Sequence, residues 1–148
     1  MSLWAWAVKA YGREGVGDLC VDLQDAHGQS VPYLLFAAWA ALEGRRVEAV
    51  RAVALARAWE AEVVSPLRAV RRRLKQELPG TADAARWALR EQVKGVELGA
   101  ERLLLEGLET LAGEPGAARP LGQALSAASL AFGGAPEAKI SRLATLLS

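Results

Sequence analysis

The fold is decided by an uncharged apolar stretch near the N-terminus, where residues 30–44 read SVPYLLFAAWAALEG. Ser30 can cap a helix, Pro32 suits its first turn, and Gly44 suits its end. The predicted helix, residues 31–43, is apolar nearly all round, so any face left in water would expose a large patch. We therefore place this helix at the centre of a helical bundle.

Two further helices are predicted before this stretch, at residues 2–11 and 14–27, each followed by a glycine. In the first of them, Trp4 and Trp6 point about 200° apart at 100° per residue, so at least one tryptophan faces away from the main seam. We favour a helix wedged between two others. The alternative is a tryptophan that contacts a partner or a membrane interface.

After the central stretch, a helix is predicted from Val47 up to Ser65–Pro66. Proline removes a backbone hydrogen bond there and either kinks the helix or starts a new one. We favour a new helix to Glu77, capped by Ser65.

A long helix is predicted near residues 82–112, after a turn at Pro79–Gly80. Its apolar positions predict a buried seam. The seam comprises Ala85, Leu89, Val93, Val96, Ala100, Leu103 and Leu111. Near its end the helix is apolar on more than one side, from Leu103 to Leu108, which suggests that something covers it.

The last segment, residues 114–148, is rich in Ala, Gly and Ser and carries two short helical patterns, beginning at Pro120 and Pro136. Helices this short rarely hold alone in water, so we expect them to dock over Leu104 and Leu108 rather than wait for a partner. The predicted fold is all-α: a compact irregular or orthogonal bundle of five to seven helices over residues 1–113, with this segment as a docked extension. No convincing strand is found.

Composition excludes several classes of function. The 148 residues carry a net charge of +1, so no global field draws the protein to nucleic acid or anionic lipid. One cysteine and one histidine supply neither a disulfide nor a Cys/His zinc cage. We expect no metal and no cofactor, no membrane span, and a reducing, cytoplasmic location.

The concentrated charge lies on the helix after Pro66, in a basic face comprising Arg68, Arg71, Arg72 and Lys75. Residues 45–80 carry a net +5 and residues 1–44 a net −3. The basic face could bind phosphate, of nucleic acid or a small anion, because guanidinium groups match phosphate oxygens in pairs. We favour internal pairing instead.

The acidic partner for that pairing is a stripe on the helix at 14–27, comprising Asp18, Asp22 and Asp25. Three close carboxylates suggest metal binding, but neither an EF-hand loop nor a Glu-x-x-His pair is present. We interpret the stripe as a solvated or salt-bridged face, or a face for a partner. His27 suits the negative end of the same helix.

Catalysis has little support in the sequence. There is no P-loop, no G-x-S-x-G elbow, no His-Glu-x-x-His motif and no second histidine to pair with a nucleophile. Cys20 lies on the apolar stripe of its helix, where a thiol is usually inert.

Several segments together resemble a family of short bacterial proteins classed as a domain of unknown function. The resemblance covers about the first two thirds of the chain and rests on Leu3-Trp4-x-Trp6-Ala7, Leu23-Gln24-Asp25, Leu34-Leu35-Phe36, Pro66-Leu67-Arg68-x-x-Arg71-Arg72 and Glu97-Leu98-x-Ala100-Glu101-Arg102. It implies a bacterial, cytoplasmic protein in which these segments form one module. It implies no activity for any residue.

The leading hypothesis for function is a non-enzymatic interaction protein that binds a protein partner or itself as a homodimer, because apolar helix surface is abundant and no chemistry is assembled. The first alternative is phosphate or nucleic-acid binding through the basic face at 68–75. The second is a small-molecule-binding protein or enzyme with an apolar pocket.

Overall fold

The structure is a computed structural model that describes residues 1–116 and 119–148. Within these residues it contains eight α-helices, a π-helical segment (η1) and two short strands. In chain order they are α1 (Leu3–Tyr11), α2 (Val16–His27), α3 (Val31–Leu42), β1 (Arg45–Val47), α4 (Ala49–Trp59), η1 (Glu60–Val64), α5 (Ser65–Leu74), α6 (Asp83–Glu109), β2 (Ala112–Pro115), α7 (Leu121–Leu130) and α8 (Glu137–Leu147). The predicted all-α class, the long helix and the helical C-terminal segment are confirmed.

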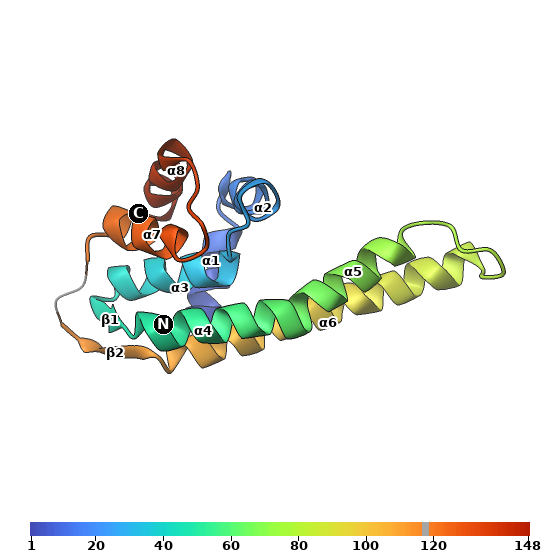
Figure 1. Cartoon of the computed structure of the whole chain (residues 1–148), viewed down its shortest axis with the longest axis horizontal. Coiled ribbons are helices and arrows are strands. Elements are labelled where there is room, and N and C mark those ends of the chain that lie inside the picture. The colour runs from blue at the N-terminus through green and yellow to red at the C-terminus, as the bar shows by residue number, and fades with distance from the viewer. Residues whose placement is uncertain (117–118) are drawn as a thin grey trace.

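The helices form two regions (Figure 1). We call the helical hairpin at residues 49–109 the arm: α4, η1 and α5 run out and α6 returns. The remaining helices form the body, against which only the base of the arm packs, so the outer half of the arm extends into solvent. The predicted compact all-α bundle is confirmed, and the projection of the arm from it was not predicted.

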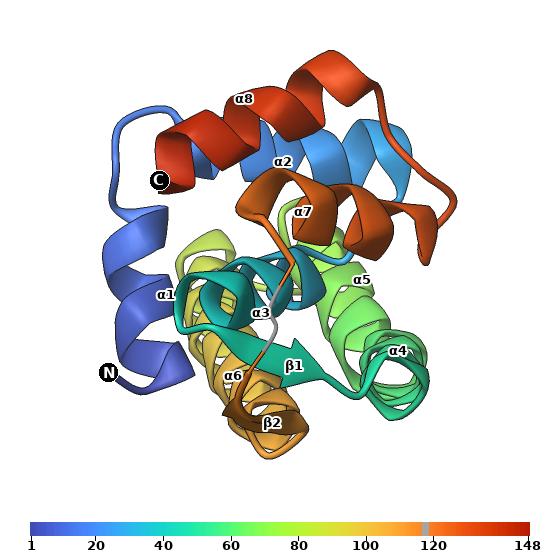
Figure 2. The ribbon, with the colours of Figure 1, turned by 90° about the vertical axis from the view of Figure 1, so that its left-hand side faces the viewer.

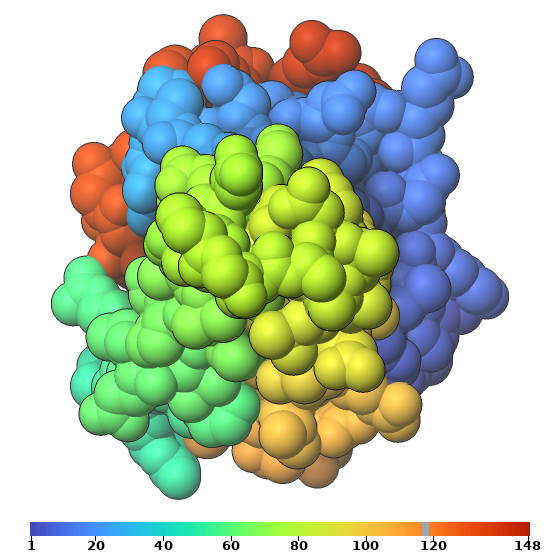
Figure 3. Space-filling model, turned by 90° about the vertical axis from the view of Figure 1, so that its right-hand side faces the viewer, coloured from blue at the N-terminus to red at the C-terminus, as the bar shows by residue number. Residues whose placement is uncertain are grey.

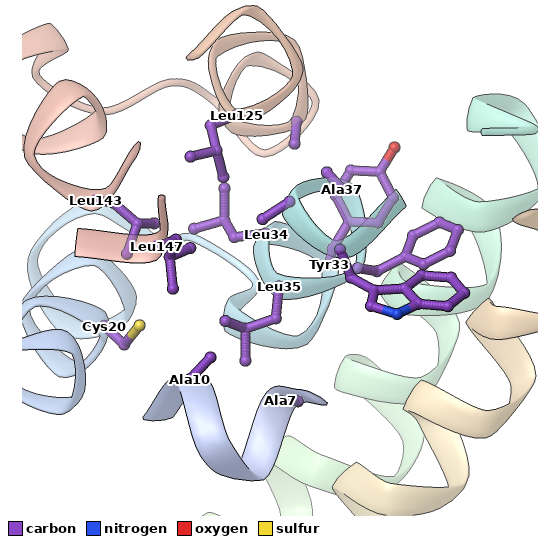
Figure 4. Close-up of a cluster of buried hydrophobic side chains, with 14 of the residues drawn as sticks. Ala7, Ala10, Cys20, Tyr33, Leu34, Leu35, Ala37, Leu125, Leu143 and Leu147 are labelled. Carbon is purple, nitrogen blue, oxygen red and sulfur yellow. The ribbon is translucent and has the colours of Figure 1, made fainter. Parts of the chain in front are cut away.

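The centre of the body is α3, as predicted. The hydroxyl of Ser30 accepts a hydrogen bond from the backbone N–H of Tyr33 (3.3 Å), which fixes the start of the helix. Every residue from Tyr33 to Ala40 is buried. In Figure 4, Leu34 and Leu35 of α3 lie among side chains from α1, α2, α7 and α8.

The two C-terminal helices cover the body rather than the arm (Figure 2). α7 packs on α3, and α8 packs on α7 and α2. The buried amide of Gln29 anchors the loop between them, donating to the carbonyls of Phe132 (3.2 Å) and Gly134 (3.1 Å). We expected these helices to dock over Leu104 and Leu108. Instead, α7 packs on the larger apolar surface of α3.

The helix does not restart at Pro66. Ser65 has helical backbone angles (φ −61°, ψ −45°), and α4 continues through η1 into α5 as one rod. A proline ring clashes with the carbonyl four residues earlier, and the wider π-helical turn just before Pro66 relieves that clash without ending the helix. The predicted Ser65 cap is therefore wrong.

Two short strands were not predicted. β1 pairs antiparallel with β2, with Arg45 opposite Pro115 and Val47 opposite Ala112. The pair joins the end of α3 to the end of α6 and so ties the arm to the body. Strands of three and four residues carry too little alternation to be read from a sequence.

Candidate functional site

A cleft of about 590 Å3 lies where the arm meets the body. Its body side comes from α1, α2 and the start of α3, and its arm side from α5 and α6. Figure 3 shows the molecule from the tip of the arm, with α1 and α2 in blue behind it. The lining residues are Trp4, Ala7, Val8, Tyr11, Gly12, Val21, Gln24, Val31, Pro32, Leu35, Arg68, Glu97, Leu98, Glu101 and Leu105.

Large apolar side chains from three helices are left open to solvent in this cleft. Val8 and Tyr11 of α1, Val21 of α2 and Leu98 of α6 are all exposed. The sequence placed Trp4, Val8 and Tyr11 on one face of the first helix. They do share a face, but it lines the cleft, while Leu3 and Ala10 face the core.

Two residues of the basic face are held by carboxylates of the arm. Arg68 Nη1 lies 3.0 Å from Glu60 Oε1, and Arg71 Nε lies 2.8 Å from Glu97 Oε2. The side chains of Arg68, Arg71 and Glu97 are largely shielded from solvent. The Arg71–Glu97 pair links α5 to α6, whereas the Arg68–Glu60 pair lies within the rod formed by η1 and α5.

The other two residues of the basic face reach outward. Arg72 Nη2 lies 3.9 Å from Asp25 Oδ1, and both side chains are more than half exposed, so this pair contributes at most about 1 kcal/mol. Lys75 is exposed at the end of α5 and has no ion pair within the described residues. The four cations therefore do not form one free surface.

The acidic stripe is divided in the same way. Asp22 bonds to Lys139 of α8 (2.5 Å), whose Nζ also lies 3.0 Å from His27 Nε2. This bond, more than the nearby charges, lowers the pKa of Asp22. Asp25 reaches Arg72, whereas Asp18 is exposed and has no ion pair among the residues described. Asp22 thus ties α2 to α8.

Glu101 is the one lining carboxylate of the cleft without an ion pair or hydrogen bond inside the described ranges. Burial raises its pKa; Arg68 opposes that rise and Glu97 adds to it. Burial also raises the pKa of Tyr11, and the charges of Cys20 and Glu101 add to the effect. The cleft is thus an apolar groove with an uncompensated acidic group in its wall.

The two tryptophans of α1 have different surroundings. Trp4 lines the cleft, and the guanidinium carbon of Arg102 lies 5.5 Å from its ring centroid. Trp6 is half-buried and packs against the core of the body. Of the two, only Trp4 is placed to touch a molecule in the cleft.

Other chemistry is not assembled in the described part of the chain. No group of three His, Cys, Asp or Glu side chains there could hold a metal ion. No helix there is long and apolar enough to cross a bilayer. Burial raises the pKa of the Cys20 thiol to about 11, which keeps it protonated and unreactive at neutral pH.

The face of α6 that looks away from the body carries a second apolar surface. Leu89, Val96 and Leu103 are 48%, 56% and 59% exposed and recur every seven residues. We call these three residues the outer stripe. They belong to the predicted buried seam, and that part of the prediction is wrong: the buried residues of α6 are Arg86, Ala100, Leu104, Leu105 and Leu108. Small residues flank the stripe, and a Cβ added at Gly95 or Gly99 would meet open space.

The cleft carboxylates Glu97 and Glu101 were not predicted as site residues. The sequence holds no local signal for them: a hairpin centred on Pro79–Gly80 would set Arg71 opposite position 88, whereas the structure pairs Arg71 with Glu97 (2.8 Å). The register that pairs the basic face with α6 therefore comes from the tertiary fold.

Comparison with known proteins gives a family but no activity. The family described as "Protein of unknown function (DUF2390)" matches residues 2–108, and the chain belongs to it. The match ends one residue before the end of α6, so it includes both faces of the arm and excludes β2, α7 and α8. No curated protein and no solved structure matches the chain.

Proposed function

We propose that this member of the family is a non-enzymatic interaction protein that pairs with a second copy of itself through the outer stripe of α6. The observation that carries the proposal is the exposure of Leu89, Val96 and Leu103 at seven-residue intervals on a helix that extends away from the body. A seven-residue apolar repeat is the pattern with which one helix packs along another. Among residues 1–116 and 119–148, no helix covers the outer stripe, whose three residues are all exposed.

A second copy fits the stripe because the stripe is symmetric. Val96 lies midway between two leucines, so a two-fold axis through Val96 sets Leu89 of one copy against Leu103 of the other. Such an isologous contact uses the same surface patch twice and closes after two copies. Gly95 and Gly99 beside the stripe leave room for the second helix to approach closely.

The position of the stripe also permits this pairing. In Figure 1, α6 runs along the lower side of the arm, and the body lies above its base. Two arms can therefore pack antiparallel while both clefts stay open. We also propose that the dimer is a bacterial cytoplasmic protein, a proposal supported by the family resemblance and by the single, buried Cys20.

Sedimentation equilibrium of the purified chain tests the proposal. We expect a reversible monomer–dimer equilibrium. We also expect Val96→Glu to weaken association by at least tenfold, because each dimer would bring two carboxylates together at the two-fold axis. A matched control is Leu98→Glu, because Leu98 and Val96 are both 56% exposed but lie on different faces of α6.

Leu98→Glu should leave the equilibrium unchanged. A wild-type chain that stays monomeric at all accessible concentrations would refute the proposal. Equal loss of association in both variants would refute it as well, since the outer stripe would then have no special role. Circular dichroism of each variant confirms that the helices remain.

A second candidate function is favoured by Glu101 alone. An apolar cleft with one uncompensated carboxylate suits a ligand or partner side chain that joins an apolar body to a cationic group. Octylammonium should then bind more tightly than octanoate, and Glu101→Gln should remove the preference. If the two ions bind equally well, Glu101 does not select a cation.

Phosphate or nucleic-acid binding through the basic face has less support. Arg68 and Arg71 already pair with carboxylates, which leaves Arg72 and Lys75 as the accessible cations of that set. Two exposed cations on a chain of net charge +1 supply little electrostatic attraction for a polyanion.

A further inference from the structure

A second cavity, of about 300 Å3, lies on the opposite side of α3 from the cleft. Elements α3, β1, α4 and α7 enclose it, and alanine side chains form most of its walls. The charged residues that line it are Arg45, Arg46 and Arg119, and no carboxylate lines it. None of the three arginines has an ion pair among the residues that the structure describes.

This pocket differs from the other arginine sites of the molecule. Arg68 and Arg71 are neutralised by Glu60 and Glu97, which lie within 3.0 Å of them. Three like charges around one small pocket repel each other, and the repulsion grows as the surroundings exclude water. An anion in the pocket would convert that repulsion into attraction.

Arg45 is held in place for such a contact. Its guanidinium carbon lies 5.7 Å from the centroid of the Trp39 ring, and Nη1 donates to the carbonyl of Gly113 (3.3 Å). These two contacts orient the planar group, yet its Nε is buried and has no hydrogen-bond partner within the described residues. A buried unpaired donor is costly in a folded protein, and an acceptor bound in the pocket would remove that cost.

Tyr33 supplies a neutral polar group to the same pocket. The residue is 3% exposed, and its ring packs against Phe36 and Phe132. Its hydroxyl has no hydrogen-bond partner within the described ranges. Burial raises the pKa of Tyr33, and the positive charge of Arg119 opposes the rise, so the hydroxyl lies within the field of that guanidinium.

We infer that this pocket is an anion-binding site for a phosphate group, either free phosphate or the monoester of a small molecule. Guanidinium groups bind phosphate oxygens through pairs of N–H donors, and a tyrosine hydroxyl adds a neutral donor. The volume lies at the lower limit for ligand pockets, so it admits a phosphate with a few carbon atoms and excludes a polynucleotide. Arg119 lies outside the residues that match the family, so the site is a feature of this chain rather than of the matched region.

Isothermal titration calorimetry tests the site, with inorganic phosphate and glycerol 3-phosphate as probes at constant ionic strength. We expect one saturable site per chain for at least one of them. Arg119→Ala should weaken binding at least tenfold. Arg119 is exposed, so its loss should not disturb the fold. Arg73→Ala, which removes an exposed arginine of α5 with no ion pair within the described part of the chain, is the matched control and should bind as the wild type does.

The two probes separate the sources of the phosphate. Equal affinity for the two probes would show that the phosphate group alone accounts for binding. Tighter binding of glycerol 3-phosphate would show that the pocket binds a small phosphorylated molecule. Tyr33→Phe keeps the ring and removes the hydroxyl, and it should weaken binding severalfold in a chain that still folds. Saturation by neither probe would overturn the inference. An Arg119→Ala variant that binds as well as the wild type would also overturn it.

Discussion

Helices α3 and α6 both carry rows of large apolar side chains, but those side chains have different surroundings. In α3, eight consecutive residues from Tyr33 to Ala40 are buried, because α1, α2, α4, α6 and α7 pack around the helix. In α6, the apolar residues at 89, 96 and 103 are exposed, because in the arm α6 packs only against the rod formed by α4, η1 and α5. The spacing of apolar residues thus predicts that a helix has an apolar face. The number of helices and strands that pack around it decides whether that face is buried.

The arm and the body are also stabilised by different kinds of interaction. The body is held by apolar packing around α3, whereas the outer arm is held by ion pairs and by the contacts of Arg86. Apolar burial contributes more to the free energy of unfolding than exposed polar contacts do. We therefore expect substitutions to affect the two regions very differently.

The largest difference is expected from the same substitution at two leucines. Leu34→Ala should lower the free energy of unfolding by about 2–5 kcal/mol, since Leu34 is 1% exposed and a cavity would remain. Leu103→Ala should change the free energy of unfolding of the monomer by no more than about 0.5 kcal/mol. Urea unfolding at low protein concentration measures both; equal losses would show that the outer stripe is buried within the monomer.

A smaller effect is expected at the tip of the arm. The buried Arg86 donates from Nε to the carbonyl of Leu74 (3.1 Å) and from Nη1 to Asp83 (2.7 Å), and so links the end of α5 to the start of α6. Arg86→Ala should lower the local stability of the tip by about 1.5–3 kcal/mol. Hydrogen exchange should then speed up in α5 but not in α3; a uniform change over both helices would contradict a local role.

The smallest effect is expected in the cleft between the two regions. Because burial raises the pKa of Glu101, the folded chain holds this proton more tightly than the unfolded chain. The contribution of protonated Glu101 to the free energy of unfolding is fully present below the pKa of the unfolded chain, about 4.3. That contribution is lost as the pH rises through the raised pKa of the folded chain. Glu101→Gln should therefore be more stable than the wild type at pH 7, by urea unfolding, and lose that advantage near pH 4. A variant less stable at pH 7 would show that the charged form is favoured.

Much of the body could be predicted from sequence. The capping Ser30, the following Pro32 and the uninterrupted apolar run specified α3 and its central place, and the glycines after α1 and α2 marked their ends. These signals act locally, within a few residues of the structure that they determine. The same reasoning failed at Pro66 because the π-helical turn that accommodates it has no such local signal.

The sites were harder to predict, because they depend on how distant segments meet. The outer stripe was identified as a seam, and periodicity could not show that no helix covers it. Arg68 and Arg71 were identified as a basic face, but their partners Glu60 and Glu97 depend on the continuous α4–α5 rod and on the hairpin register. The arginines of the second cavity come from β1 and from the segment before α7, and only the tertiary fold brings them together.

Disulfide formation across the proposed two-fold axis tests the central claim most directly. Cys20 is buried with a thiol pKa of about 11, so a cysteine introduced on α6 is the reactive one. Under mild oxidation, Val96→Cys should give a covalent dimer, because the axis places the two residues side by side, and Leu98→Cys should stay monomeric. Equal cross-linking at both positions, or none at position 96, would contradict the pairing of two arms through the outer stripe.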